Sequence, residues 1–294
     1  MNNFTQIFQR VEKKYLLTEY QYFALRRFLE GTARVDRYGE TSILNIYYDT
    51  PDFRLIRASL DGPAYKEKLR LRSYGVPADD STAFLEIKKK YQGIVYKRRI
   101  DMPYRQAADY LAGGGKNVCG GGTWDRKNRS FDMVPEGKNT CCGRTPEGKN
   151  NTAESDCQIR KEIEWFFRIY PGLGPRMAVC YDRIALEGIT DPDFRVTFDR
   201  NITWRTKDLD LEAGNSGKRI LEPGTYLMEL KILGAVDPAL SGEMSRLGIF
   251  PVGFSKYGQG FLAMQREWMT QDTGRRRYTV PAPEFLHPAA SAAV

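Results

Sequence analysis

The segment YKEKLRLRSYG, residues 65–75, carries a positive charge at every second position. These positions are Lys66, Lys68, Arg70 and Arg72. Alternate side chains of an extended strand share a face, so the segment predicts a strand with its cations on one side and Leu69 and Leu71 on the other. A single strand of this kind most often shows its charged face to solvent, and the segment alone favours that interpretation.

The same alternation recurs in five further segments that we predict to be strands. Their stripes are Arg10, Glu12 and Lys14; Glu86, Lys88 and Lys90; Lys97, Arg99 and Asp101; Arg195, Thr197 and Asp199; and Glu229 and Lys231. A charged face that points to solvent would explain one such strand, but the repetition in six strands makes that explanation less favourable. In the last segment leucines reinforce the apolar side, which predicts a strand covered on both faces and an enclosed Glu229–Lys231 pair.

Composition narrows the possible chemistry. The 294 residues include 45 Lys and Arg against 37 Asp and Glu, a net charge of +8, which suggests a polyanionic partner such as nucleic acid, phosphate or an anionic membrane. The single histidine, His287, lies in a segment rich in Pro and Ala. This disfavours Ser-His-Asp, Cys-His and His-ligated zinc chemistry in the folded part. Catalysis would have to rest on carboxylates, Lys, Arg, Tyr and a hard metal ion.

The sequence also indicates a compartment. No apolar stretch approaches the roughly 20 residues that span a bilayer, and the first residues lack a secretory pattern. Five cysteines, an odd number, fit a reducing environment. We therefore expect a cytoplasmic protein without direct membrane insertion. Cys180 is expected in the core, and the other four are expected to be free thiols because none has zinc-ribbon spacing. They are Cys119, Cys141, Cys142 and Cys157.

The chain predicts one domain over residues 1–269, with a loop-rich insertion at about 113–155 and a disordered tail at 270–294. Strands are expected at 8–17, 42–50, 64–74, 82–91, 93–102, 176–188, 193–203 and 225–233. Helices are expected at 18–31, 51–62, 103–112, 157–172, 238–248 and 254–269. Thr18 and Gln21 have the spacing of a helix capping box, and Gln92-Gly93 that of a hairpin. Because most neighbouring strands can pair antiparallel, we predict an α+β fold in which a β-barrel carries the charged faces inward.

Cations that face one another need a partner. Two like charges at ~4 Å repel by about 4 kcal/mol at an effective dielectric constant of ~20, so water and anions must fill such an interior. Phosphate oxygens match it, since Arg binds them through a planar fork and Lys as a point charge. A carboxylate among the cations either neutralises a neighbour or holds Mg²⁺ or Mn²⁺.

Plainer explanations exist for individual residues. Glu86–Lys88 and Glu229–Lys231 fit structural ion pairs at least as well as a metal site. Arg183 fits a buried pair with Asp182 or another carboxylate. Lys256 fits an ordinary surface lysine at the start of a helix.

Eight motifs in a fixed order resemble the VTC domain, the polyphosphate polymerase domain of the vacuolar transporter chaperone complex and a member of the triphosphate tunnel metalloenzymes. They are R-x-E-x-K-Y at 10–15, K-L-R-L-R-S-Y-G at 68–75, L-E-I-K at 85–88, Y-K-R-R at 96–99, Y-D-R at 181–183, F-R-V-T-F-D at 194–199, M-E-L-K at 228–231 and S-K-Y at 255–257. The resemblance covers about residues 8–268, apart from the insertion.

The resemblance implies an eight-stranded antiparallel tunnel that binds ATP or polyphosphate and, with a divalent cation, transfers the terminal phosphoryl group to a growing polyphosphate chain. The implied catalytic phosphate ligands are Lys14, Arg70, Arg72, Lys88, Lys97, Arg183, Arg195 and Lys256. Further phosphate-binding candidates, also facing the tunnel by alternation, are Arg10, Lys68, Arg99 and Lys231. Glu229 is the implied metal ligand, and Glu12 is a second candidate.

One departure from the wider superfamily is informative. Arg10 stands where the superfamily often has the first Glu of E-x-E-x-K, which favours the polymerase-like branch over the triphosphatase and adenylate cyclase branch. The chain shows neither the membrane spans nor the sensor domain of the eukaryotic complex, so a membrane partner would be a separate protein.

Four functions follow, in decreasing order of support. The first is an ATP-dependent polyphosphate polymerase, and the second is hydrolysis of inorganic or nucleoside triphosphates in the same tunnel. The third is a non-catalytic polyphosphate-binding module. Nucleic-acid binding comes last, because the aromatic residues do not interleave with the cations as a base-stacking surface requires.

Overall fold

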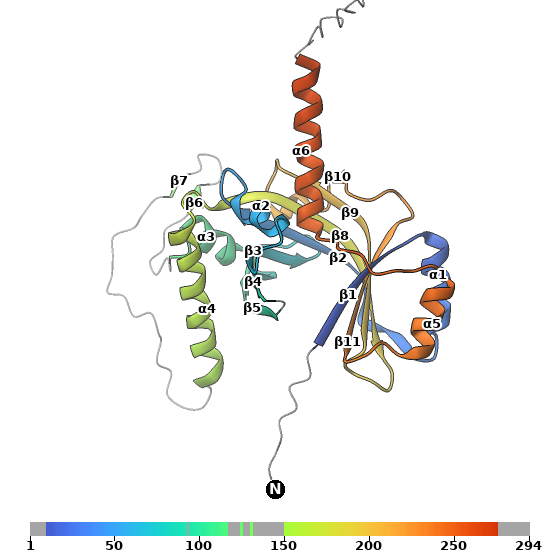
Figure 1. The fold of residues 1–294 in the computed structure, drawn as a ribbon. Helices are drawn as coiled ribbons and strands as arrows, with labels where there is room; N and C mark the ends of the chain where they lie inside the picture. The colour runs from blue at the N-terminus through green and yellow to red at the C-terminus, as the bar shows by residue number, and fades with distance from the viewer. Residues whose placement is uncertain (1–9, 93, 117–123, 126–129, 132–149, 276–294) are drawn as a thin grey trace, which may run out of the picture.

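The computed structural model of the chain describes residues 10–92, 94–116, 124–125, 130–131 and 150–275. One large antiparallel sheet dominates it, with helices on the outside (Figure 1). The strands are β1 (Arg10–Leu17), β2 (Ala33–Asp49), β3 (Tyr65–Tyr74), β4 (Thr82–Tyr91), β5 (Ile94–Pro103), β8 (Gly174–Gly188), β9 (Arg195–Arg205), β10 (Lys218–Arg219) and β11 (Tyr226–Leu233), with β6 (Trp124–Asp125) and β7 (Ser130–Phe131) forming a separate pair. The helices are α1 (Glu19–Leu29), α2 (Arg54–Leu60), α3 (Tyr104–Ala112), α4 (Asn150–Ile169), α5 (Pro238–Arg246) and α6 (Lys256–Arg275), besides a 3₁₀ turn at Leu211–Ala213.

The main sheet has nine strands in the order β1-β11-β9-β8-β2-β3-β4-β5, with the short β10 attached to β9. All its pairs are antiparallel. The predicted antiparallel sheet with flanking helices is therefore confirmed. The predicted barrel is not, because β1 and β5 end the order and no backbone pairing joins them within the described residues.

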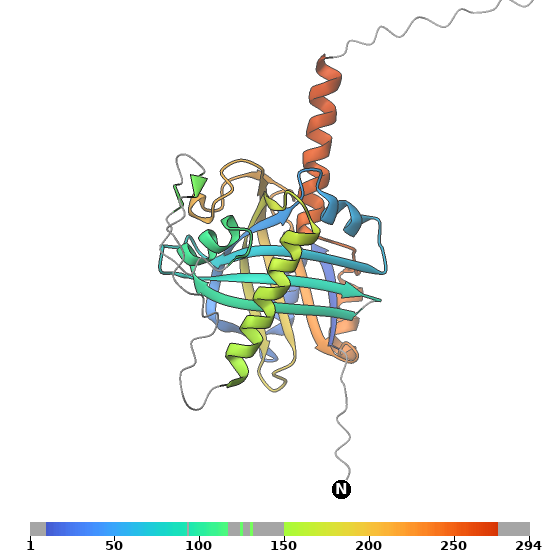
Figure 2. The ribbon, with the colours of Figure 1, turned by 90° about the vertical axis from the view of Figure 1, so that its left-hand side faces the viewer.

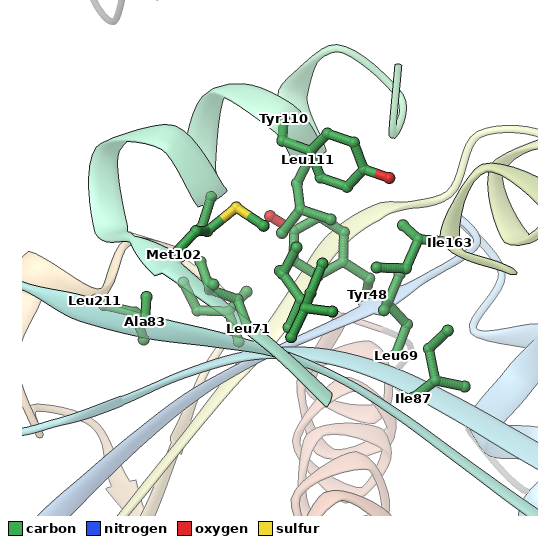
Figure 3. Close-up of a cluster of buried hydrophobic side chains, with 14 of the residues drawn as sticks. Tyr48, Leu69, Leu71, Ala83, Ile87, Met102, Tyr110, Leu111, Ile163 and Leu211 are labelled. Atoms are coloured by element: carbon green, nitrogen blue, oxygen red, sulfur yellow. The ribbon is translucent and has the colours of Figure 1, made fainter. Parts of the chain in front are cut away.

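Alternation along β3 and β4 sends apolar side chains to the outer face of the sheet. There Leu69, Leu71 and Ile87 pack against α3 and α4, and each of the three residues exposes at most 2% of its surface to solvent. Figure 3 shows these side chains together with Leu111 of α3 and Ile163 of α4. In Figure 2 α4 crosses this part of the sheet. The outer apolar layer fixes the strand register and so forces the charged set to the inner face.

Two further apolar clusters complete the core. The first lies between β1, β9 and β11 and the helices α1 and α5, and it includes Leu25 and Phe198. The second cluster packs side chains of β2 and β8 against α2 and α6. It includes Tyr47 of β2, which stacks on Tyr257 of α6 with ring centroids 4.3 Å apart. This second cluster fixes the start of α6 at one end of the sheet's concave side.

Several element boundaries differ from the prediction. Strand β2 begins at Ala33 rather than at residue 42, because the polar stretch 33–41 pairs with β8 through a register shift that the alternation does not reveal. Helix α4 begins at Asn150, inside the predicted insertion, and α6 continues to Arg275, inside the predicted tail. The capping box of Thr18 and Gln21 is confirmed.

Most of the insertion, the tail from residue 276 and four residues named above lie outside the described residues. These four are Cys119, Cys141, Cys142 and His287. Cys180 is buried in β8, as predicted, and Cys157 is half-buried on α4.

Candidate functional site

The inner face of the sheet lines a partly open cavity of about 650 Å³. Twelve basic side chains line it, against four acidic ones. The basic residues are Lys13, Lys14, Lys66, Lys68, Arg70, Arg72, Lys88, Lys90, Lys97, Arg183, Lys231 and Lys256. The acidic residues are Glu12, Glu67, Glu86 and Glu229. The predicted convergence of striped strands on a shared positive interior is thus present in the structure.

Glu86 on β4 forms the first carboxylate centre of this cavity. It stands opposite Arg70 in the β3–β4 register, and Arg70 Nε donates to its Oε2 at 2.6 Å. Lys97 Nζ from β5 lies 2.9 Å from Oε1, and Arg72 Nε lies 3.7 Å from Oε2. Burial acts to raise the pKa of Glu86, but Arg70, Arg72 and Lys97 outweigh it and hold the pKa well below its usual range. Glu86 is therefore an anchor that fixes three predicted phosphate ligands.

Asp199 on β9 and Glu229 on β11 form the second carboxylate centre. Arg183 of β8 donates to both oxygens of Asp199, at 2.6 and 2.7 Å, and to Glu229 Oε2 at 3.3 Å. Lys256 Nζ lies 2.5 Å from Asp199 Oδ2 and 2.9 Å from Glu229 Oε1. Lys14 Nζ is 3.5 Å from Glu229 Oε1.

These contacts decide between the alternatives that the sequence left open. Arg183 pairs with Asp199 and not with Asp182, which instead accepts from Ser42 and Asn201. Lys256 is buried at the helix start instead of lying on the surface. Burial acts to raise the pKa of Glu229, but Lys256, Arg183 and Lys14 hold it well below its usual range.

Six of the cavity lysines lack such a partner among the described residues, and burial lowers the pKa of three of them. Within the described part of the chain, no carboxylate lies within 4.0 Å of the amines of Lys68, Lys88 and Lys231. Burial lowers the pKa of all three, and that of Lys68 falls to about 8. Lys68 and Lys231 are half-buried and Lys88 is the more exposed of the three. A partly desolvated ammonium without a counter-charge is unfavourable, so these lysines favour the entry of an anion.

The segment before α6 completes one wall of the cavity. Pro251 bridges to Tyr15, and the Val252 N–H donates to the carbonyl of Lys14 at 2.8 Å, so the segment runs along the free edge of β1. The Lys14 amine donates to the Phe254 carbonyl at 3.1 Å. The S-K-Y motif follows directly, which explains how Lys256 reaches the Asp199–Glu229 centre from a distant part of the sequence.

The structure brings most of the predicted site residues together. Those lining the cavity are Glu12, Lys14, Lys68, Arg70, Arg72, Lys88, Lys97, Arg183, Glu229, Lys231 and Lys256. Arg195 does not line it: this half-exposed side chain at the start of β9 lies 3.5 Å from Asp36 of the β2 extension. Arg99 does not line the cavity, but its Nε lies 4.0 Å from Glu86 Oε1 and its guanidinium covers the Phe84 ring at 3.5 Å. The side chain of Arg10 lies outside the description.

Sequence reasoning missed two kinds of site residue. Asp199 was placed in a stripe, but its role as the buried partner of Arg183 and Lys256 was not foreseen. The tyrosines Tyr47 and Tyr181 also line the cavity, where Tyr47 accepts from Arg70 at 3.1 Å and Tyr181 accepts from Arg72 at 3.3 Å. The alternation of polar residues in β2 was the available signal for Tyr47.

The described residues hold no group of three or more His, Cys, Asp and Glu side chains that could bind a metal ion. Glu12 and Glu229 do line the same cavity, and Glu12 has only a loose ion pair, 3.8 Å to Lys14. This donor set fits Mg²⁺ or Mn²⁺ in the common mode in which one or two carboxylates share the ion with water and substrate phosphates. It does not fit a cage made of protein ligands alone.

Among the described helices, none combines the length and the apolar character required to cross a membrane.

Fold and cavity together define an antiparallel β-sheet domain built around a cationic cavity. The sequence profile of the VTC domain matches residues 9–265. The chain therefore belongs to the VTC domain family, as the eight motifs indicated.

Solved structures add likenesses of fold at low identity. A provisionally assigned adenylate cyclase from Vibrio parahaemolyticus is 12% identical, with a TM-score of 0.38 over 86% of this chain and 97% of that one. A provisionally assigned adenylyl cyclase from Hippeastrum, reported to have a dominant triphosphatase activity, is 13% identical, with a TM-score of 0.45 over 87% and 96%. The Mimivirus capping enzyme triphosphatase is 9% identical, with a TM-score of 0.30 over 81% and 88%. A search of curated proteins found no match.

Proposed function

We propose that the cavity binds ATP, triphosphate or polyphosphate and that the protein is an ATP-dependent polyphosphate polymerase assisted by Mg²⁺ or Mn²⁺. One observation carries the proposal: twelve basic and four acidic side chains line a single cavity. A linear chain of phosphates, each with a negative charge, matches an excess of cations distributed along several strands. Membership of the VTC domain family supports the same substrate class.

In the proposed reaction, a terminal oxygen of the polyphosphate chain forms a bond to the γ-phosphorus of ATP. The bond from that phosphorus to the β,γ-bridging oxygen breaks, and ADP leaves. Phosphoryl transfer of this kind depends mainly on positioning and on stabilising charge at the transferred group, so it needs no histidine.

The cavity residues divide this task. In this proposal Lys14, Lys68, Lys88, Lys97 and Lys231, which all line the cavity, contact phosphate oxygens as point charges. Arg70, Arg72 and Arg183 are held in fixed orientations by Glu86 and Asp199, so they are pre-organised to receive phosphate. A divalent ion held by Glu12 and Glu229 together with substrate phosphates would offset further negative charge.

The polymerase assignment is tested by incubating the purified protein with ATP and Mn²⁺ and measuring long-chain phosphate on gels. Chain growth in the wild type that Lys88→Ala and Glu229→Ala abolish supports it. Release of orthophosphate without chain growth would show a triphosphatase in the same cavity. Equal product from wild type and Glu229→Ala would contradict the metal role of Glu229.

A specific observation also favours the second candidate, a non-catalytic polyphosphate-binding module. Glu229 lies within 3.5 Å of three cationic groups, and the described residues offer no three-ligand metal cluster. Tight binding of polyphosphate that is independent of metal, with no turnover of ATP, would establish this alternative. Competition with single-stranded DNA would test the expectation that nucleic acid is not a partner.

A further inference from the structure

The carboxylates of the cavity are distributed unequally among its cations. Arg70, Arg72 and Lys97 share Glu86, while Arg183 and Lys256 share Asp199 and Glu229. These groups keep their charge whether or not an anion is present. The uncompensated charge is concentrated instead on lysines that have no carboxylate within reach.

Lys68 is one of these lysines, and the contacts around it are well defined. Its amine donates to the Ser255 hydroxyl at 3.0 Å, a neutral acceptor. The groups that face it are Lys66 and Arg70 on its own strand β3, Lys88 on β4, Lys14 on β1, Tyr47 on β2 and Lys256 at the start of α6. Burial is the main cause that lowers the pKa of Lys68; Tyr47 acts to raise this pKa, and the ammonium groups of Lys88, Lys14 and Lys66 lower it further.

Tyr47 differs from the other groups around Lys68, because it acts to raise the pKa of the lysine and not to lower it. Burial acts to raise the pKa of its phenol, but Arg70, Lys68 and Arg72 outweigh it and lower the pKa to about 8. The pKa of Lys68 is also lowered to about 8, chiefly by burial. The positive charge of the cavity therefore falls as the pH rises, because Lys68 and Tyr47 both lose protons near pH 8.

We infer that binding of a polyanion in this cavity is coupled to uptake of a proton by the amine of Lys68, so that pH controls the affinity. A phosphate oxygen beside Lys68 supplies the counter-charge that the protein itself withholds, and the amine takes a proton from the buffer to become an ammonium. The inference rests on the proposed function only in that a polyanion enters the cavity; it requires no catalysis.

The expected magnitudes follow from linkage. If Lys68 is half-protonated near pH 8 when free and fully protonated when bound, its contribution weakens binding about tenfold between pH 7 and pH 9. At pH 8.5 binding takes up about three-quarters of a proton at this site.

Calorimetric titration with sodium tripolyphosphate at pH 8.5, in two buffers of different ionisation enthalpy, measures this uptake. Lys68→Arg keeps a cation that does not titrate, so it should bind tripolyphosphate while taking up about three-quarters of a proton less than the wild type. Because both proteins meet the same ligand, protons taken up by the ligand itself cancel in the difference. Lys89→Arg is the matched control, because Lys89 lies on the neighbouring strand β4 outside the cavity lining and pairs with Glu162; it should leave the uptake unchanged.

Two results would overturn the inference while leaving the proposed function intact. One is equal proton uptake by wild type and Lys68→Arg when both bind. The other is loss of the uptake in Tyr47→Phe but not in Lys68→Arg, which would assign it to the phenol. Absence of any tripolyphosphate binding by the wild type would overturn both proposals.

A second experiment measures the titration of the Lys68 amine directly by nuclear magnetic resonance of the ligand-free protein. The midpoint of this titration should lie near pH 8, and a midpoint above about pH 10 would also contradict the inference.

Discussion

Arg183 donates two hydrogen bonds to Asp199, from Nε at 2.6 Å and from Nη2 at 2.7 Å, across the neighbouring strands β8 and β9. Asp199 is fully buried, and Lys256 binds the same carboxylate from the start of α6. One aspartate therefore joins two strands and a distant helix, and it fixes two cations that face the cavity. The ion pair holds the two strands together, and it also orients the guanidinium of Arg183 in the cavity.

Removing the Asp199 carboxylate should be costly. Asp199→Ala leaves Arg183 and Lys256 dependent on Glu229 alone, and loss of one partner of a buried ion pair typically costs about 3–5 kcal/mol. Chemical denaturation should show a loss of this size. The matched control is Glu40→Ala, which breaks the exposed pair with Arg200 and should cost under about 1 kcal/mol. Similar losses from the two variants would refute the anchoring role.

The structure separates two residues that the motifs treat alike. Lys88 lines the cavity without a carboxylate partner, whereas Arg195 lies outside the lining beside Asp36. Lys88→Ala should weaken tripolyphosphate binding about tenfold or more, equivalent to about 1.4 kcal/mol. Arg195→Ala should change it less than about twofold, as expected of an exposed rim charge. Binding isotherms at one fixed ionic strength provide the measurement, and a larger effect at Arg195 would argue against the cavity as the binding site.

Acid should destabilise the fold through Glu86. Its pKa is held below the usual range in the folded protein, so its ion pairs stabilise the fold above the pKa of an unfolded glutamate, and that stabilisation is lost as the pH falls toward the folded value. Below about pH 4, this group should contribute a loss of up to about 1.4 kcal/mol per pH unit. Unfolding free energies at several pH values should show a shallower acid limb for Glu86→Gln. An unchanged limb would mean that Glu86 does not titrate differently in the two states.

The start of α6 depends on a buried hydrogen bond. The Tyr257 hydroxyl donates to Asp49 Oδ2 at 2.8 Å, and the same carboxylate accepts from the backbone of Leu55 and Ile56. Tyr257→Phe keeps the ring stacked on Tyr47 but removes the donor, which should cost about 1–3 kcal/mol. Thermal or chemical unfolding measures the loss. Tyr38→Phe, at an exposed tyrosine, should have no comparable effect.

The alternation of charge was sufficient to predict most of the fold that surrounds the site. A strand such as β3 must place Lys68 and Leu69 on opposite faces, and α4 covers the apolar face, so the lysine has to point inward. Local signals also located the α1 cap and the hairpin between β4 and β5. The β2 extension escaped prediction because its residues are polar and its pairing with β8 shifts register, which no local pattern encodes.

What the sequence determined by itself was thus the set of cations that strand geometry turns to one side, because a period of two residues fixes the facing of each side chain. Tertiary structure alone decided how those cations divide. Asp199 forms an ion pair with Arg183, and Glu86 forms one with Arg70. Lys68 and Lys88 have no carboxylate partner within the described residues. The physical reason is that ion pairing depends on distances of a few ångströms between side chains from different strands, and those distances are set only when the strands and α6 pack together.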